Sequence, residues 1–400
     1  MALFWQFLFW MSGGLLLYTY VLYPWWLSRL ARGRQLMTER YDRPETGPRV
    51  TVLMAVHNEE RVLEEKLNSL LVQEYPREQY SIWVGSDCST DATNDILARY
   101  AAAHDHFHFF PFLERQGKPG VINHLAAAAA AAYPVGDRHV FLITDASVIL
   151  SPSVVWKLVR HFRSPELAIV DAHMRHTGMQ AAGISRSENQ YISREVGLKH
   201  HESVLWQYMI GPFGGCYALR SDYFEPIPGT FLVNDFYLTM RAFERGGRAI
   251  NELEAVCHEP VGHELGEEFR RKARISAGNF QNLVRFRRLW WPPLGVPQAL
   301  FFSHKVLRWL GPFLLLIILA AAVALSGNQL YRWLLLILLS GFILVPLLDV
   351  GLRRYRLHWL PLRHVRYFLM MNLALLVGFF RYLKGIKTNV WQPPKRYAED

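Results

Sequence analysis

Apolar residues are concentrated toward the two ends of this 400-residue chain, and this distribution limits the folds that it can adopt. The run from Ala2 to Trp26 contains no charged residue, and further apolar runs follow residue 308. About 20 consecutive apolar residues span a bilayer as a helix, so these runs predict membrane helices. The residues between them have the composition of a water-soluble α/β domain. We therefore expect a membrane protein with one soluble domain between its spans.

The apolar and basic segments suggest where the parts of the chain begin and end. The N-terminal run lacks the basic start and the small-residue cleavage site of a signal peptide, so we expect it to be retained. The predicted order is an N-terminal transmembrane helix (1–28), a basic linker (29–48), a cytosolic domain (49–285), an interfacial segment (286–308), two or three C-terminal transmembrane helices (309–383) and a basic tail (384–400).

The net charge of +10 fits this arrangement, because Lys and Arg residues border the apolar runs. Basic flanks are typical of the cytoplasmic side of a membrane and attract anionic lipid head groups. We therefore expect an integral inner or plasma membrane protein with a cytoplasmic soluble domain. Nucleic-acid-binding proteins are also basic, but these residues follow no nucleic-acid-binding motif, so nucleic acid is not an expected partner.

The last apolar run, 367–380, leaves two topologies open. A fourth complete span would place Lys384 and Lys387 on the outer side, against the positive-inside tendency. Either this run is re-entrant or interfacial, or the tail is an exception to the tendency.

The three cysteines, Cys88, Cys216 and Cys257, argue against a disulfide framework and against a zinc cluster. They are odd in number and lie far apart, without the paired spacing of either kind of site. Free cysteines are typical of a reducing compartment, in agreement with a cytosolic domain.

The central segment begins as alternating strands and helices. Apolar, β-rich runs predict strands, and apolar residues at helical spacing predict helices between them. An alternating order of this kind favours a parallel sheet whose ligands bind beyond the carboxyl ends of the strands. Residues 152–280 are less regular. The predicted strands are 50–56, 81–84, 107–110 and 139–144, and the predicted helices are 61–74 and 94–103.

Polar residues follow three of these strands within a few residues. Asn58 and Glu59 come after the first, Asp87 after the second and Asp145 after the buried strand 139–144. An acidic residue there is costly unless it is paired or binds a metal, and Mg²⁺ or Mn²⁺ prefers oxygen ligands. Each of these residues could also simply end a strand. We assign the nearby Asp91 to capping the following helix rather than to ligand binding.

Further polar clusters lie both in residues 152–280 and before them. The acidic cluster at Asn234-Asp235 could simply be a helix cap or a salt bridge. The basic stretch at 269–281 could simply be a solvated helix. The His residues at 104, 106 and 108 are interpreted as a loop rather than a metal site. The clusters are Gly117-Lys118 with Asn123, a glycine-rich turn at 211–220 with Gly214 and Gly215, Asn234-Asp235 at the start of a predicted helix, and a basic stretch at 269–281 with Arg271 and Arg274.

Taken together over residues 48–285, the order and spacing of these clusters resemble the family 2 glycosyltransferases. The resemblance is to the membrane-embedded branch that includes cellulose, chitin, hyaluronan and poly-N-acetylglucosamine synthases. It implies a GT-A-type α/β domain with a Rossmann-like mixed sheet. It also implies an inverting hexosyl- or N-acetylhexosaminyl-transferase that uses a UDP-sugar donor and Mg²⁺ or Mn²⁺.

The resemblance also assigns roles to residues. Asp235 would be the catalytic base. Asp145 would bind the metal, with Ser147 or His258 as the alternatives for a second ligand. Gly214, Gly215 and Asn234 would face the sugar or the acceptor. The nucleotide-sugar-binding residues would be Asn58, Glu59, Asp87, Lys118, Asn123, Asp145, Ser147, Arg271 and Arg274.

The sequence departs from the family pattern at four positions, one of which is Ser86, where a first Asp is common. Ser147 replaces the second Asp of the D-x-D element, so metal binding rests on fewer carboxylates. Ile275 and Arg271 stand where processive synthases have Trp and Gln, which leaves processivity open.

The expected acceptor is a saccharide or a lipid-linked molecule. The alternatives are a polysaccharide synthase, a single-transfer glycolipid or polyprenyl-phosphate enzyme, and a catalytically silent nucleotide-sugar-binding subunit. Nothing in the sequence indicates the oligomeric state.

Overall fold

The computed structural model describes residues 1–136, 138–177, 185–260, 265–354 and 360–389. The chain divides into two compact units. The first consists of Met1–Arg29, Gln180–Ile192 and His263–Gly385, and the second of Leu30–Met179, Ser193–Gly262 and Ile386–Asp400. The predicted tail lies largely outside the described residues, because the description ends at residue 389.

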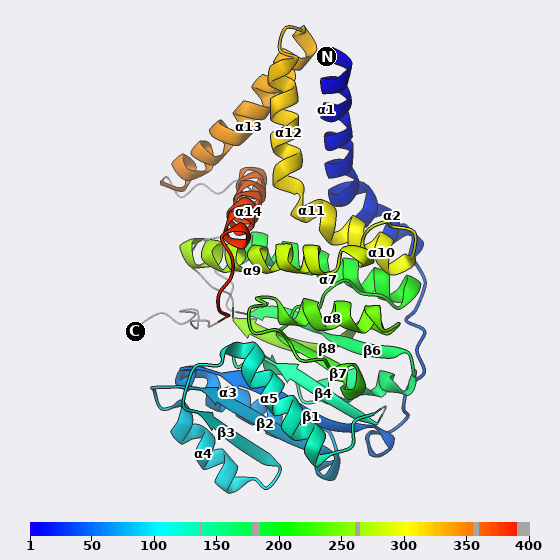
Figure 1. The fold of residues 1–400 in the computed structure, drawn as a ribbon, viewed down its shortest axis with the longest axis vertical. Helices are drawn as coiled ribbons and strands as arrows, with labels where there is room; N and C mark the ends of the chain where they lie inside the picture. The colour runs from blue at the N-terminus through cyan, green and yellow to red at the C-terminus, as the bar shows by residue number, and fades with distance from the viewer. Residues whose placement is uncertain (137, 178–184, 261–264, 355–359, 390–400) are drawn as a thin grey trace. The chain divides into compact units, whose positions relative to one another are not determined.

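The second unit is built on a mixed sheet with the strand order β3-β2-β1-β4-β7-β6-β8-β5 (Figure 1). Strands β1 to β4 are parallel to their neighbours among themselves, and β7 runs antiparallel to both β4 and β6. The predicted mixed α/β fold is thus confirmed. The strands are β1 (Arg49–Val56), β2 (Tyr80–Asp87), β3 (Phe107–Phe112), β4 (His139–Thr144), β5 (Ile149–Leu150), β6 (Leu167–Thr177), β7 (Cys216–Arg220) and β8 (Arg248–Pro260).

Helices connect the parallel strands, as the sequence pattern predicts. Helix α3 (Glu60–Leu71) follows β1 and buries an apolar face that includes Val62, Leu63 and Leu67. The alanine run forms the second half of α5. The buried side chains of α5 are small or aliphatic. The other helices of this unit are α4 (Thr93–Ala103), α5 (Gly117–Ala132), α6 (Val154–Val159) and α8 (Asn234–Glu244), and α7 (Ser185–Trp206) is shared between the units.

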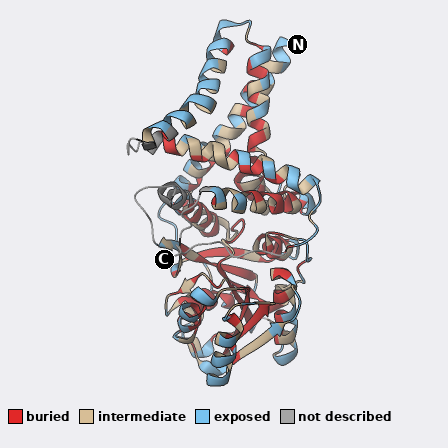
Figure 2. Cartoon of the chain, turned by 90° about the vertical axis from the view of Figure 1, so that its left-hand side faces the viewer, coloured by how far each residue is buried: buried red, intermediate tan, exposed pale blue. Residues whose placement is uncertain are grey.

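The core of the second unit lies along the central strands. Both faces of β1 and β2 are buried, and Figure 2 shows the buried residues gathered on the strands of the sheet. Parallel strands covered by helices on both faces are typically continuous apolar runs, and this explains why β1, β2 and β4 were recognisable in the sequence. Burial holds these strands rigid, so their carboxyl ends can position polar side chains.

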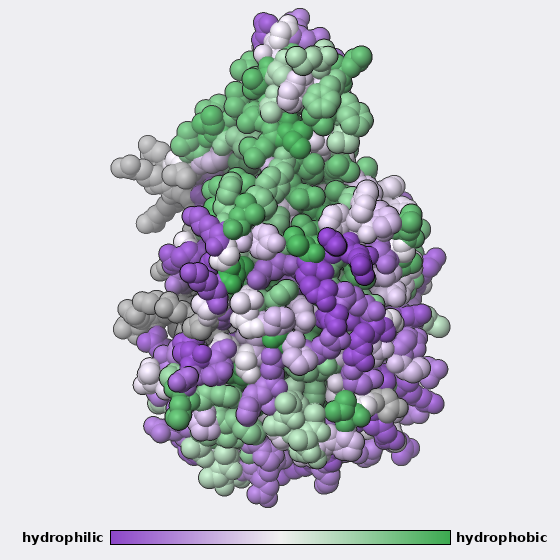
Figure 3. Space-filling model, viewed as in Figure 1, coloured by the Kyte–Doolittle hydropathy of each residue, from purple (hydrophilic) through white to green (hydrophobic). Residues whose placement is uncertain are grey.

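The first unit consists of apolar helices. Within the described residues, Ala2–Leu30, Gln329–Asp349 and Leu362–Leu383 are long and apolar enough to cross a membrane. Val296–Trp309 and Gly311–Ala324 meet that criterion only as a pair, bent by 60°, which would make a fourth span. Figure 3 shows apolar side chains on the outer surface of these helices. The helices are α1 (Ala2–Leu17), α2 (Tyr23–Leu30), α10 (Val296–Phe301), α11 (Leu307–Trp309), α12 (Gly311–Ala324), α13 (Gln329–Arg354) and α14 (Leu360–Leu383).

One amphipathic helix of the first unit lies between the N-terminal span and the later spans in sequence. This helix, α9 (Leu265–Arg285), packs closely against α14 within the unit. Gly378 allows the close approach, because a Cβ atom there would lie 2.4 Å from the Cβ of Ser276 and 2.8 Å from the backbone nitrogen of Ala277. The basic stretch at 269–281 therefore belongs to the compact unit of the apolar helices.

Candidate active site

The predicted polar residues that follow β1, β2 and β4 lie at the carboxyl ends of the parallel strands. In-register pairing aligns the end of β1 with that of β2, since Val56 is opposite Ser86, and places β4 on the other side of β1. The side chains that follow these strands are therefore brought to one edge of the sheet. In open α/β sheets this edge is where ligands bind.

Asp87 lies at the end of β2 and has no exposed surface. Its carboxylate accepts hydrogen bonds from the backbone nitrogens of Gln116 and Gly117, at 2.5 and 3.1 Å, and from Nε of Arg115 at 3.0 Å. A carboxylate has about four acceptor positions, so three donors leave little capacity for a ribose or base. In this structure Asp87 anchors the start of α5, and its contact with a nucleotide stays a prediction.

Asn58 and Asp91 organise the neighbouring turns. Asn58 adopts a positive φ of 53°, and its Oδ1 accepts a hydrogen bond from the backbone nitrogen of Thr90 at 2.8 Å. Asp91 accepts from the backbone nitrogens of Thr93 at 3.0 Å and Glu60 at 3.2 Å, so it satisfies donors at the starts of both α4 and α3. Asp91 thus satisfies helix-start donors as predicted, but the N-cap residue of α4 itself is Ala92. The backbone nitrogen of Glu59 bonds to Thr93, and its side chain is partly exposed.

Lys118 and Asp145 form an ion pair at the centre of this edge. The ammonium of Lys118 contacts Oδ1 of Asp145, and both side chains are partly exposed. The backbone of Asp145 is fixed from both sides: its nitrogen donates to Gly215 at 3.0 Å, and its carbonyl accepts from the nitrogen of Val148 at 3.2 Å. The carboxylate is thus held on a defined turn while remaining accessible.

Asp235 stands in the first turn of α8 beside the glycine-rich turn. Gly214 has a φ of 78°, and a Cβ atom at this position would lie 2.9 Å from Oδ2 of Asp235. Burial, with a smaller contribution from Asp145, raises the pKa of Asp235 to about 6, while the nearby charge of Lys118 opposes the rise. Asp145, Lys118 and Asp235 are therefore close enough to influence one another electrostatically.

Of the predicted glycine-rich turn, residues 216–220 form β7, and only 211–215 precede it as a turn.

The available ligands fit a divalent cation that is shared with a diphosphate. Among the described residues, no group of three or more His, Cys, Asp or Glu side chains could hold a metal. Mg²⁺ is usually bound through one or two carboxylates together with phosphate oxygens and water, and Asp145 offers one accessible carboxylate. Ser147 lies two residues further on the same turn. His258 is on β8, opposite Ile149 in register.

The remaining predicted residues have other partners in the structure. Both polar atoms of the Asn123 side chain bond to the backbone of Ile227, at 2.8 Å each, so Asn123 ties α5 to the segment before α8. Arg271 pairs with Glu268 at 2.9 Å on α9, which also carries Arg274. Since α9 belongs to the first unit, the diphosphate contacts assigned to these two arginines stay predictions.

Two residues at this edge were missed in the sequence. Arg115 contacts both Asp87 and Nε2 of His57, and its position two residues before the Gly117-Lys118 cluster could have indicated it. Asn389 is buried, and its amide nitrogen bonds to the carbonyl of Phe231 and lies 3.4 Å from Oδ1 of Asn234. No local pattern could have indicated Asn389, because its partners are more than 150 residues away in sequence.

The close approach of Asn389 extends to the start of α5. Its carbonyl oxygen would lie 3.2 Å from a Cβ atom placed on Gly117, whose φ is 71°. The short segment that follows α14 thus returns to the second unit and packs between the Lys118 loop and the start of α8.

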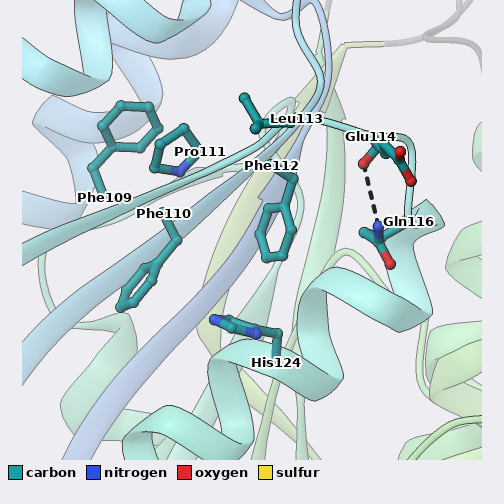
Figure 4. Close-up of a pocket in the computed structure, with 8 residues that line it drawn as sticks. All are labelled: Phe109, Phe110, Pro111, Phe112, Leu113, Glu114, Gln116 and His124. Atoms are coloured by element: carbon teal, nitrogen blue, oxygen red, sulfur yellow. Dashed lines mark hydrogen bonds between the residues drawn. The ribbon is translucent and has the colours of Figure 1, made fainter.

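A separate groove of about 530 Å³ lies along β3 and α5 (Figure 4). Aromatic side chains line it, and His124 packs edge-on against Phe112 with ring centroids 5.1 Å apart. Gln116 is its only lining residue that also bonds to Asp87, and neither Asp145 nor Asp235 lines the groove. The groove is therefore distinct from the acidic centre.

The comparisons with known proteins agree with this geometry. The family model described as glycosyl transferase family 2 matches residues 51–227. A beta-monoglucosyldiacylglycerol synthase from Nostoc sp. is 28% identical over 125 residues, which are 31% of this chain and 25% of that protein. A poly-beta-1,6-N-acetyl-D-glucosamine synthase from Staphylococcus aureus is 21% identical over 241 residues, 59% of this chain and 56% of that protein. The chain thus spans between a quarter and just over half of the length of these relatives.

A solved structure supports the fold over almost the whole chain. The mannosyltransferase PcManGT from Pyrobaculum calidifontis, in complex with GDP-Man and Mn²⁺, matches with a TM-score of 0.67 and 21% identity. The match covers 94% of this chain and 99% of that one. Residues 51–227 therefore match the glycosyl transferase family 2 model, and the mixed sheet has the GT-A fold of the solved glycosyltransferase structure.

Proposed function

We propose that this protein is an inverting glycosyltransferase that moves a hexosyl or N-acetylhexosaminyl group from a UDP-sugar to a saccharide or lipid-linked acceptor at the membrane. The observation that supports it is the juxtaposition of Asp235 with the Lys118–Asp145 pair. One side of this arrangement can stabilise a leaving diphosphate, and the other can deprotonate an attacking hydroxyl. The matched domain ends at residue 227, so the role of Asp235 is part of the proposal.

Asp145 and Lys118 would act on the donor. A bound Mg²⁺ or Mn²⁺ supplies Lewis-acid stabilisation of the diphosphate leaving group. Asp145 would hold this cation through its accessible carboxylate, and Lys118 would turn from Asp145 to a phosphate oxygen. Asn58, Glu59 and Asp87 would contact the nucleoside, and Arg115, which covers Asp87, would have to move for that contact.

Asp235 would act on the acceptor. Its carboxylate takes the proton of the acceptor hydroxyl while the hydroxyl oxygen bonds to the anomeric carbon and the bond from that carbon to the diphosphate oxygen breaks. Attack from the face opposite the diphosphate inverts the configuration. A pKa of about 6 leaves Asp235 ionised at neutral pH yet basic enough to accept a proton. Gly214 and Gly215 leave space for the sugar and the acceptor beside it.

The identities of donor and acceptor follow from weaker observations. The first relative named above makes a glucolipid, which favours a lipid acceptor, and the second makes a polysaccharide, which favours a saccharide acceptor. The structural relative binds GDP-Man, so a GDP-sugar is the alternative to a UDP-sugar. The candidate spans and their basic flanks favour a membrane-embedded enzyme with a cytoplasmic site. Processive polymer synthesis and single transfer both fit these observations.

A nucleotide-release assay tests this proposal. The full-length protein in lipid is given a panel of UDP- and GDP-sugars with Mn²⁺ or Mg²⁺, and release is compared with that of Asp235→Asn. We expect nucleotide release from one donor class. Asp235→Asn should lose this release, and adding more Mn²⁺ or Mg²⁺ should not restore it. Nucleotide binding without release from any donor, with lipid and saccharide acceptors supplied, would instead support a catalytically silent binding subunit.

A further inference from the structure

A lysine lies buried behind the turn that carries Asp145. Lys66 on α3 has no exposed surface. Its ammonium donates hydrogen bonds to Oγ1 of Thr144 at 2.8 Å and to the carbonyl of Val148 at 2.5 Å. These two residues stand at the start and at the end of the turn, and Asp145 lies between them.

The burial of this charge is energetically costly. Apart from Ser69, the other side chains on the buried face of α3 are aliphatic, and a methionine or leucine at position 66 would fill the same space without the cost of removing a charge from water. Burial lowers the pKa of Lys66 to about 8, and the nearby Cys216, Cys257 and, to a smaller extent, Asp145 act in the opposite direction. At neutral pH the side chain therefore remains mostly protonated, directly behind an acidic turn.

The hydrogen bonds of Lys66 belong to a larger network. Thr144 Oγ1 donates to the carbonyl of Gly215 at 2.9 Å, and the backbone nitrogen of Asp145 donates to the same carbonyl at 3.0 Å. Gly215 follows Gly214, which lies against Asp235. Lys66 thus connects both ends of the Asp145 turn with the glycine-rich turn next to Asp235.

We propose that Lys66 is a positioning residue for the metal–diphosphate site. It holds the 144–148 turn in the conformation that presents the Asp145 carboxylate, and its charge favours the anionic metal–diphosphate complex over the metal alone. The inference rests on the proposed role of Asp145. Ser147 replaces a second carboxylate here, so the precision of a single carboxylate carries more of the binding.

Titration of UDP into the full-length protein with Mn²⁺ tests the role of Lys66. We expect Lys66→Met to weaken Mn²⁺-dependent UDP binding roughly 10–100-fold, the range usual for residues that orient a metal ligand. The Mn²⁺ concentration needed for half-maximal activity should rise while kcat at saturating Mn²⁺ changes less. Glu65→Gln is the matched control, because Glu65 is the exposed neighbour on the same helix. A lower melting temperature with unchanged UDP binding would mean that Lys66 is only structural and would overturn the proposal.

Two variants of Thr144 keep the test decisive if Lys66→Met does not fold. Thr144→Val removes the hydroxyl that accepts from Lys66, and Thr144→Ser keeps it. The proposal requires weaker Mn²⁺-dependent UDP binding in the first and near-normal binding in the second. Equal binding in both contradicts it.

Asp145→Asn separates this inference from the proposed function. If Asp145→Asn binds UDP and Mn²⁺ normally, the assignment of Asp145 is wrong, and the role of Lys66 falls with it. If Asp145→Asn loses binding while Lys66→Met retains it, the assignment of Asp145 stands and only the role of Lys66 is refuted.

Discussion

Asp235 shows how its surroundings can prepare a carboxylate for base catalysis. Burial and Asp145 favour the protonated form, whereas Lys118 and the backbone at the start of α8 favour the ionised form. The balance puts the pKa near 6, well above the ordinary value of an aspartate. A base with such a pKa is ionised at neutral pH and still takes up a proton readily.

The pH dependence of kcat/KM follows from this balance. Only ionised Asp235 can accept the proton, so activity should rise with pH through about 6. Lys118→Met removes the charge that lowers the pKa of Asp235, so the rising limb should move to higher pH. A kcat/KM profile from pH 4.5 to 8.5 measures it, with Lys157→Met on α6 as the control. A limb that stays in place or moves to lower pH in Lys118→Met would refute the electrostatic assignment.

Gly214 is the residue whose substitution should disturb Asp235 most directly. Gly214→Ala forces a side chain into a backbone with φ 78° and places its Cβ 2.9 Å from Oδ2 of Asp235. Misplacing a reacting group by about 1 Å can cost about 10²-fold in rate, so we expect a kcat loss of this order with donor binding retained. Gly229→Ala is the control, because a Cβ there meets nothing within 4 Å. Normal turnover in Gly214→Ala would show that Asp235 tolerates displacement.

At the scale of elements, the parallel half of the sheet could be predicted and the rest could not. Strands β1, β2 and β4 are continuous apolar runs because helices cover both of their faces. Strands β6 and β8 pair in parallel although they are about 80 residues apart in sequence, and the carboxyl-terminal parts of both strands carry polar side chains. Such pairing depends on tertiary contacts, which no local sequence pattern records.

The site divides in the same way. Asp87 ends a strand, Asp145 follows one and Asp235 lies in the first turn of a helix, so their positions could be predicted. Lys66 could not, because a lysine on an amphipathic helix is normally taken as exposed, and only the packing of α3 against the Asp145 turn buries it.

The packing of α9 against α14 gives a prediction for the stability of the first unit. Gly378→Ala would place a Cβ 2.4 Å from that of Ser276, so the two helices must separate. Overpacking of this kind costs about 1–3 kcal/mol, and the melting temperature in detergent should fall. Gly341→Ala on α13 should leave it unchanged, since a Cβ there meets nothing within 4 Å. If both variants melt alike, the close contact between α9 and α14 does not exist in solution.

At the scale of the whole molecule, a GT-A domain shares one chain with helices of membrane-spanning length. The distribution of apolar residues predicted this combination, because spans and soluble domains differ sharply in composition. It could not predict that 265–285 would group with the apolar helices, since α9 is amphipathic and resembles a helix of a soluble domain.

Extraction of membranes tests the predicted anchoring. With three candidate spans, the protein should remain in the membrane pellet after washing with alkaline carbonate and should be released only by detergent. A peripheral protein held by its basic residues would be released by the same wash. Recovery of the full-length chain in the carbonate supernatant would therefore exclude the transmembrane assignment.

The assignment of Asp235 as the base is tested most directly by comparing chemistry with binding in one variant. With the donor identified by nucleotide release, kcat and the Kd of that donor are measured for the wild type and for Asp235→Asn. A positioned base contributes about 10²–10⁴-fold, so kcat should fall by that factor while the Kd stays unchanged. Near-normal kcat in Asp235→Asn would contradict the account and would show that another group takes the proton of the acceptor.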